Sequence, residues 1–328
     1  GLKALQRQRA QKHMRAGNQF RVFKRSDPFD KKRALRTIRE HVEKSATEME
    51  DFWPTAFYLG VQKSGSTAVE SLLRKHPQVC KGEELKFFNG GLLWTHGGLE
   101  VYLDMFASDK KCKKIIGPEG EKGQNGFGLD ASPNYICNEQ AIKNIYDSVP
   151  KSKRSKLKFI VVLRSPLERD LSMFNHFRLE FFMRFLEDNK LSLEDVKDNA
   201  ERREKLLRRF EQNDEDFASY AGTLQQNIQS YATSEKDCDE NPLYRGMYFS
   251  QLTTLWKYFD RDQTLVLNFD TLVSDARDTL RRIADFLEIE RKPMLVDELP
   301  HLNTQDFFGK IELQSLDGQV CKEAVKFF

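Results

Sequence analysis

One loop of the sequence gathers groups that bind phosphate. The apolar run Ala56–Val61 predicts a buried strand, and apolar residues recur at helical spacing from Val69 to Leu73. Residues 60–67 contain two glycines, three hydroxyl side chains and Lys63. A helix N-terminus presents backbone N–H groups and a partial positive charge, to which hydroxyl donors and an ammonium group add. The pattern therefore predicts an anion-binding loop between a strand and a helix, suited to a phosphate group.

The order of residues in this loop separates it from a Walker A loop, which ends in Gly-Lys-Ser/Thr. Here Lys63 precedes Gly65. Residues 60–67 (GVQKSGST) resemble the 5′-phosphosulfate loop of sulfotransferases that use 3′-phosphoadenosine 5′-phosphosulfate (PAPS). The alternative is a turn whose glycines serve only backbone geometry. The resemblance implies that PAPS is the co-substrate and that the residues binding it are Gln62, Lys63, Ser64, Gly65, Ser66 and Thr67.

A second segment carries a candidate base. Residues 84–88 (ELKFF) resemble the Glu-x-x-Phe-Phe element of the heparan sulfate sulfotransferases, and residues 83–90 are especially similar to their N-sulfotransferase domain. The resemblance implies that Glu84 removes the acceptor proton while Lys63 stabilises developing charge. A surface carboxylate without a catalytic role is the alternative.

The strand predicted over residues 157–163 ends in a third segment. Its nearly continuous apolar run is typical of a parallel strand buried on both faces. Residues 163–172 resemble the family's 3′-phosphate element, which implies that Arg164 and Ser172 bind the 3′-phosphate of PAPS and of the product, adenosine 3′,5′-bisphosphate. A magnesium-dependent kinase would carry a carboxylate where Arg164 stands, so we expect no metal ion.

Two further correspondences are weaker. Residues 129–135 resemble a strand-to-loop element near the acceptor, but Asp130 and Ala131 stand where heparan members have Glu-Lys, so an assisting lysine is absent. Near the C-terminus, Lys326 matches the lysine of a nucleotide-closing loop, although Phe327 replaces its glycine. A solvated lysine near a chain end is the alternative reading of Lys326.

The order of predicted elements defines the fold class. Strands and helices alternate, with a helix over residues 138–149 and a further strand over residues 264–269 followed by another helix. We expect an α/β fold in which a parallel sheet is flanked by helices, the P-loop nucleotide kinase-like fold of sulfotransferases. Residues 110–114 and 117–128 read as one exposed loop.

The domain organisation follows from charge and length. Residues 1–50 are polar and basic, which predicts an N-terminal arm. Residues 51–328 are expected to form one sulfotransferase domain, with a charged helical elaboration at about 178–242 over the mouth of the site.

Composition limits the partners. A net charge of +3 over 328 residues is too small to predict nucleic-acid binding. The five cysteines lack CxxC spacing, which makes a zinc site improbable and leaves the redox compartment open. No apolar run is long enough to span a membrane, so we expect no membrane contact by these residues. The resemblance favours the Golgi lumen, with an anchor outside these residues, and the cytoplasm is the alternative.

The predicted reaction is transfer of a sulfuryl group from PAPS to a hydroxyl or amine, on a saccharide by resemblance to the heparan enzymes. A small-molecule metabolite is the alternative acceptor. A nucleotide kinase of the same fold and a catalytically inactive binding module are the other function classes. If the base is a histidine instead, the candidates are His76, His96 and His176. The sequence does not predict the oligomeric state.

Overall fold

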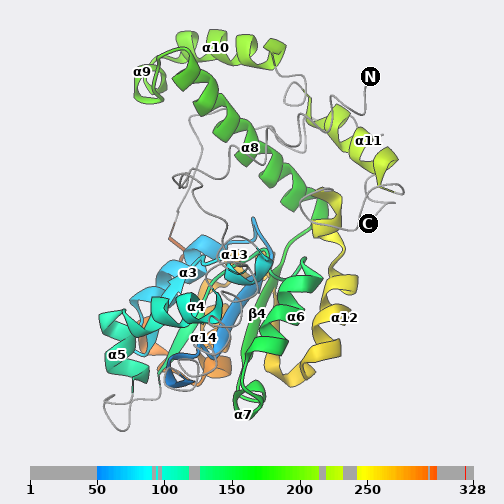
Figure 1. The fold of residues 1–328 in the computed structure, drawn as a ribbon. Coiled ribbons are helices and arrows are strands. Elements are labelled where there is room, and N and C mark those ends of the chain that lie inside the picture. The colour runs from blue at the N-terminus through cyan, green and yellow to red at the C-terminus, as the bar shows by residue number, and fades with distance from the viewer. Residues whose placement is uncertain are drawn as a thin grey trace, which may run out of the picture. The chain divides into compact units, whose positions relative to one another are not determined.

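The computed structural model describes residues 50–90, 94, 98–117, 126–213, 219–231, 242–294, 296–300 and 322. They contain a sheet of parallel strands in the order β2-β3-β1-β4-β5. The strands are β1 (Ala56–Gly60), β2 (Val79–Glu83), β3 (Phe127–Asp130), β4 (Lys158–Leu163) and β5 (Thr264–Asn268). This arrangement confirms the predicted α/β fold with its parallel sheet (Figure 1).

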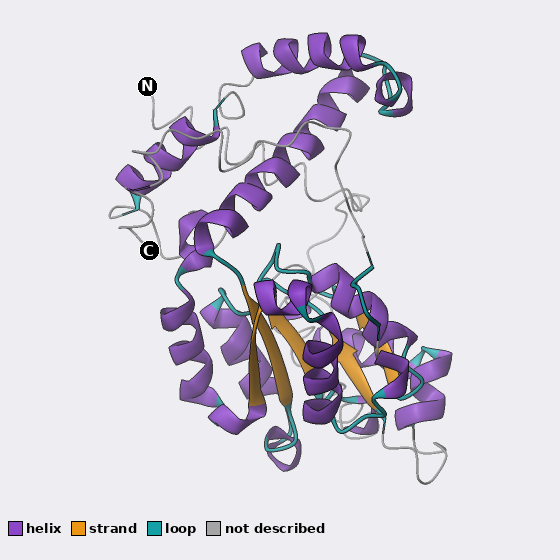
Figure 2. Ribbon diagram, turned by 180° about the vertical axis from the view of Figure 1, so that it is seen from behind, coloured by secondary structure: helices purple, strands orange, loops and turns teal. Residues whose placement is uncertain are grey.

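Helices cover both faces of the sheet because the central strand is apolar on both sides (Figure 2). Phe57 and Leu59 point into one core, while Ala56 and Tyr58 point into the other. The first core is closed by α4 (Gly98–Ala107), α5 (Lys110–Ile116), α6 (Glu139–Ser148) and α12 (Tyr248–Tyr258). The second is closed by α3 (Ser66–Lys75), α13 (Phe269–Ser274) and α14 (Ala276–Leu287).

A long helix, α8 (Pro166–Asp188), leaves the carboxyl end of β4 (Figure 1). Its first part packs against α11 (Tyr220–Ser230) through Phe174 and Tyr220, and its last part packs against α10 (Ala200–Asn213) through Phe182 and Phe210. The predicted start of the helical elaboration, at about residue 178, therefore falls inside one continuous helix. The remaining short helices are α7 (Lys151–Arg154), α9 (Glu194–Lys197), η1 (Glu50–Phe52), η2 (Phe87–Asn89), η5 (Pro242–Gly246), η6 (Arg261–Gln263) and η7 (Lys292–Met294).

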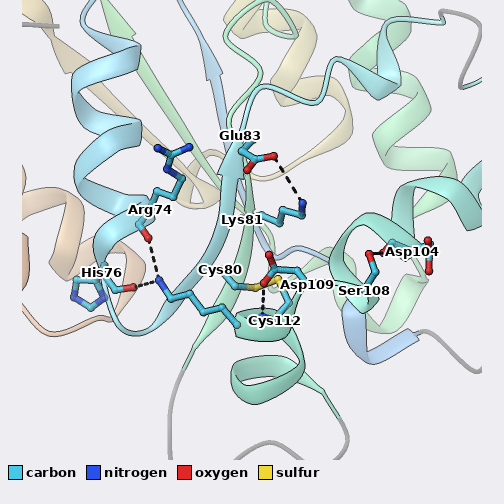
Figure 3. The surroundings of a disulfide bond; sticks show 10 residues. Arg74, His76, Cys80, Lys81, Glu83, Asp104, Ser108, Asp109 and Cys112 are labelled. Atoms are coloured by element: carbon cyan, nitrogen blue, oxygen red, sulfur yellow. Dashed lines mark hydrogen bonds and ion pairs between the residues drawn. A yellow bond between two sulfur atoms is a disulfide. The ribbon is translucent and has the colours of Figure 1, made fainter.

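The exposed loop predicted over residues 117–128 is wrong at its end, where Phe127 and Gly128 are buried in β3. The exposed loop predicted over residues 110–114 is wrong as well. These residues lie in α5, where Cys112 and Ile115 are buried and Asp109 caps the helix by accepting a hydrogen bond from the Cys112 amide at 2.8 Å. Cys112 is joined by a disulfide to Cys80 of β2 (Figure 3). The neighbouring Lys111 donates to the carbonyl of Arg74 at 2.9 Å, so α5 is fastened to both β2 and the end of α3.

Several predictions lie outside the described residues. They include the basic arm (except Glu50), residues 118–125 of the predicted loop, residues 214–218 and 232–241 of the helical elaboration, His96 and Lys326. Within the part of the chain that the structure describes, no helix combines the length and apolar character needed to cross a membrane.

Candidate active site at the carboxyl ends of the strands

The predicted site residues follow strand ends that meet at one edge of the sheet. Lys63 comes shortly after β1, Glu84 directly after β2 and Arg164 directly after β4. In parallel sheets of this kind, ligands bind at the carboxyl edge, where adjoining loops converge. The fold thus brings the three predicted segments to the same edge from far apart in the sequence.

The loop after β1 has the geometry of an anion cradle. Lys63 (φ 70°) and Gly65 (φ 78°) both adopt left-handed backbone conformations, so the chain turns sharply into α3. The Ser64 hydroxyl is fully buried and has no hydrogen-bond partner among the described residues. An unpaired buried hydroxyl is costly. A phosphate oxygen would accept its hydrogen bond, so this loop fits the phosphate end of PAPS.

Arg164 connects the loop to the third segment. Its Nη1 donates to the carbonyl oxygen of Lys63 at 3.1 Å, and its guanidinium lies 4.7 Å from the centre of the Phe269 ring. The Tyr248 hydroxyl donates to the Arg164 carbonyl at 2.9 Å. Ser172 lies on α8 and is partly exposed. The two predicted nucleotide-binding segments are therefore in direct contact through Arg164.

Gln62 has a partner that sequence reasoning did not find. Its Oε1 accepts a hydrogen bond from Arg245 of η5. Arg245 lies 183 positions further along the chain, so the only signal for it in the sequence was a positive charge shortly before the residues that form α12. The contact ties the loop after β1 to the segment that leads into α12.

Glu84 follows β2 directly, and its side chain is 36% exposed. Its Oε1 is 3.2 Å from Nζ of Lys86, whereas the neighbouring Glu83 pairs with Lys81 at 3.7 Å. Glu70 of α3 belongs to the same acidic region. Burial and the nearby charges of Glu84 and Glu83 raise the pKa of Glu70 to about 7, against the lowering effect of Arg74.

Of the candidate histidines, His76 and His176 lie in the described residues. His176 is near the charges of the site, and His76 lies at the far end of α3. His176 of α8 keeps an exposed edge, yet protein atoms surround much of its ring. This burial, with the positive charges of Lys63 and Lys86, lowers the pKa of His176. His76 is buried at the end of α3, where Nδ1 accepts from the Gln78 amide at 3.1 Å and Nε2 donates to the Glu290 carbonyl at 2.9 Å. Both His76 nitrogens are thus engaged in holding backbone.

A parallel sheet with loops that converge at its carboxyl edge is typical of enzymes that bind phosphorylated nucleotides there. The sulfotransferase domain model matches residues 54–310, and the chain belongs to that family. The family and the site together identify a transferase, and members of this family normally use PAPS.

Similar proteins include heparan sulfate enzymes. The mouse bifunctional heparan sulfate N-deacetylase/N-sulfotransferase 4 is 31% identical over 39% of this chain and 13% of its own length. The mouse heparan sulfate glucosamine 3-O-sulfotransferase 3B1 is 26% identical over 73% of this chain and 47% of its own length. The membrane-associated sulfotransferase kil1 of Dictyostelium discoideum is 24% identical over 72% of this chain and 56% of its own length. The chain thus spans at most 56% of the length of these relatives.

A solved sulfotransferase from Alicyclobacillus acidocaldarius superposes with a TM-score of 0.50 at 18% identity, over 84% of this chain and 91% of that one. At this identity the likeness supports the fold alone.

Proposed function

We propose that this chain transfers the sulfuryl group of PAPS to a hydroxyl or amine of a saccharide. The observation that carries the proposal is the contact of Arg164 with the Lys63 carbonyl, beside the buried hydroxyl of Ser64, which has no hydrogen-bond partner within the described part of the chain. It puts two cations and a hydrogen-bond donor at the N-terminus of α3, which suits a nucleotide with phosphate at both its 5′ and 3′ positions.

Each residue of the site has one part in the proposed reaction. PAPS supplies the sulfuryl group, whose bond to the 5′-phosphate oxygen breaks as the acceptor oxygen or nitrogen bonds to sulfur. Glu84 takes the proton that the acceptor loses, and Lys63 stabilises the negative charge on the departing phosphate oxygen. Gln62, with residues 64–67, binds the 5′ end, while Arg164 and Ser172 bind the 3′-phosphate. Lys326 is proposed to close over the nucleotide.

The saccharide acceptor is supported by similarity to the heparan sulfate enzymes, both in sequence and in the segment that carries Glu84. Lumenal placement, as in the Golgi, is supported by the buried disulfide between Cys80 and Cys112, because disulfides persist in oxidising compartments. Cys137 is disulfide-bonded as well.

The decisive experiment is a transfer assay with radiolabelled PAPS against three acceptor classes: glycosaminoglycan saccharides, small phenols or alcohols, and buffer alone. We expect label on the saccharides and no loss of rate when EDTA is added. Transfer only to small molecules would move the acceptor to the alternative class. Phosphoryl transfer from ATP that requires magnesium would instead identify a kinase.

Lys63→Ala tests whether the cation acts on the reaction or on binding. Because the charge on the departing oxygen grows in the transition state, turnover should fall by about a hundredfold or more while nucleotide affinity changes much less. Single-turnover kinetics together with calorimetry of adenosine 3′,5′-bisphosphate separate the two effects. A loss confined to affinity would leave Lys63 as a binding residue only.

A further inference from the structure

A buried carboxylate lies behind the segment that carries Glu84. Asp130, the last residue of β3, is fully buried. Its Oδ1 accepts from the Ser132 hydroxyl at 2.6 Å, and its Oδ2 accepts from the hydroxyls of Tyr102 at 3.0 Å and Tyr135 at 3.1 Å. The backbone N–H of Leu85 donates to the same carboxylate. Four hydrogen-bond donors therefore converge on the Asp130 carboxylate. Asp130 was named from the sequence only because Asp130 and Ala131 stand where the heparan sulfate enzymes have Glu-Lys.

Three of these four contacts lead to the backbone of residues 84–88, which we call the base loop. The Leu85 amide reaches Asp130 directly. The Lys86 amide donates to the Ser132 hydroxyl at 2.9 Å, and the Phe88 amide donates to the Tyr135 hydroxyl at 3.2 Å. Each of these hydroxyls in turn donates a hydrogen bond to Asp130. One carboxylate thus orients three amide contacts of the base loop.

The base loop needs such support. Lys86 adopts a left-handed conformation (φ 51°), which residues other than glycine seldom occupy. Glu84 is partly exposed, and its ion pair is to Lys86, which belongs to the same loop. That pair cannot fix the loop against the rest of the protein. The backbone contacts to β3 and the segment after it can.

Burying the Asp130 carboxylate in this space costs free energy. An ionisable group in an apolar core loses its hydration, and burial raises the pKa of Asp130 to about 6 despite the donors around it. Apolar residues of similar volume often serve stability as well or better. The cost suggests a role beyond packing.

We propose that Asp130 is a positioning residue that holds the base loop, through Ser132 and Tyr135, in the conformation that presents Glu84 to the acceptor. The inference rests on the proposed function, since it gives Glu84 its role as base. It also gives Ser132 and Tyr135, which follow β3 and have no other part in the proposed reaction, a role in anchoring the base loop.

Two tyrosines provide a matched pair of variants. Tyr102 and Tyr135 each donate to Oδ2 of Asp130, and each ring packs against Phe88, with centroids 4.8 and 5.9 Å apart. Only the Tyr135 hydroxyl also accepts from the base loop. Tyr135→Phe and Tyr102→Phe therefore remove equivalent bonds to Asp130 and keep both rings, but only the first removes a backbone anchor.

We expect Tyr135→Phe to lower kcat by at least tenfold, with KM for PAPS and the dissociation constant of adenosine 3′,5′-bisphosphate within about threefold of wild type. Tyr102→Phe should stay within about threefold of wild type in kcat. Ser132→Ala should behave like Tyr135→Phe, and Ser132→Thr, which keeps the hydroxyl, should recover most of the activity. Equal kcat losses in the two tyrosine variants would overturn the proposal.

Hydrogen exchange supplies a readout that does not depend on turnover. In the full chain, the amides of Leu85, Lys86 and Phe88 should exchange at least tenfold faster in Tyr135→Phe and at the wild-type rate in Tyr102→Phe. If the exchange pattern holds but wild type transfers no sulfuryl group, the proposed function fails while the anchoring of the loop stands. If base-loop exchange is unchanged in Tyr135→Phe, the inference itself is wrong.

Discussion

Glu84 is the residue on which the proposed chemistry depends most directly. Glu84→Gln keeps the size of the side chain and removes its basicity, so turnover should fall by about 10²–10⁴. Binding of adenosine 3′,5′-bisphosphate should barely change, because the nucleotide contacts lie in other segments. Steady-state kinetics and calorimetry measure the two quantities.

The neighbouring Glu83→Gln is the matched control and should remain active, since Glu83 pairs with Lys81. Near-normal turnover in Glu84→Gln, together with loss of activity in His176→Ala, would transfer the role of base to His176, whose pKa is lowered by burial and by the charges of Lys63 and Lys86.

Glu70 predicts a pH dependence of stability. Its folded pKa of about 7 lies above the ordinary value of 4.5, chiefly because of burial. Folding therefore favours the protonated form, so the stabilisation is complete below about pH 4.5 and is lost as the pH rises through 7. Glu70→Gln cannot ionise, and its Tm relative to wild type should be higher at pH 8 than at pH 5.

The cause of this dependence can be tested in the same thermal scans. In a Glu84→Gln background, one of the charges that raise the pKa of Glu70 is gone, so the pH-dependent part of the Tm difference should shrink. A difference between Glu70→Gln and wild type that stays constant from pH 5 to pH 8 would contradict the assignment.

At the scale of single residues, sequence reasoning succeeded where a group and its neighbours are local. The loop around Lys63 and the strand end at Arg164 were both identified, and the structure brings them together. It did not find that Asp130 supports the base loop, or that Arg245 holds Gln62. These contacts join segments far apart in the chain, and their geometry depends on the completed fold.

Among the elements, the disulfide between β2 and α5 makes a measurable contribution. It closes a loop with a sequence separation of 32 residues, for which the chain-entropy model gives about 3–4 kcal/mol. The double variant Cys80→Ala, Cys112→Ala should lose stability of this order in denaturant titrations under oxidising conditions. Reductant should then destabilise the variant less than wild type. Equal stability of variant and wild type without reductant would refute the contribution.

Helices and strands were predicted correctly where their buried residues form a clear apolar pattern in the sequence. The strand and helix predicted at residues 157–163 and 138–149 agree closely with β4 and α6. β2 was missed because its second half is Lys81, Gly82 and Glu83, a polar run typical of loops. α5 was missed for a similar reason, because its four lysines obscure the apolar pattern of its buried residues, Cys112 and Ile115.

For the whole molecule, binding of the nucleotide should increase the free energy of unfolding. Adenosine 3′,5′-bisphosphate at a hundredfold excess over its dissociation constant should add about 2.7 kcal/mol to the free energy of unfolding. 5′-AMP at the same concentration should raise the Tm less, because it lacks the phosphate assigned to Arg164 and Ser172. Charge-assisted bonds of this kind are worth about 1.5–3 kcal/mol each, so at least a tenfold weaker affinity is expected.

Arg164→Ala supplies the control for this comparison. The variant should lose most of the preference for the 3′,5′-bisphosphate while 5′-AMP still binds through the loop after β1. Thermal shifts that are equal for both nucleotides in wild type would contradict the placement of the 3′-phosphate.

The helical elaboration was predicted from charge and length, and the last part of α8 together with helices α9, α10 and α11 lies in that stretch. What the sequence did not indicate is that α10 and α11 pack on a single helix, α8, which begins two residues after Arg164. Its effect on the choice of acceptor stays a prediction, as does the single domain over residues 51–328.

The order of the strands in the sheet also determines when each strand can pair during synthesis of the chain. β1 lies between β3 and β4, so neither of its neighbours exists when it leaves the ribosome. About 100 residues must follow β1 before β4 is complete, which takes roughly 5–20 s at ordinary rates of translation. Until β3 is complete, about 70 residues after β1, the apolar strand that leads into the Lys63 loop has neither of its neighbours to pair with, and until β4 is complete one of its edges stays unpaired. Early release of the chain, or stalling before β4, should therefore favour aggregation, and this strand is where chaperones should bind.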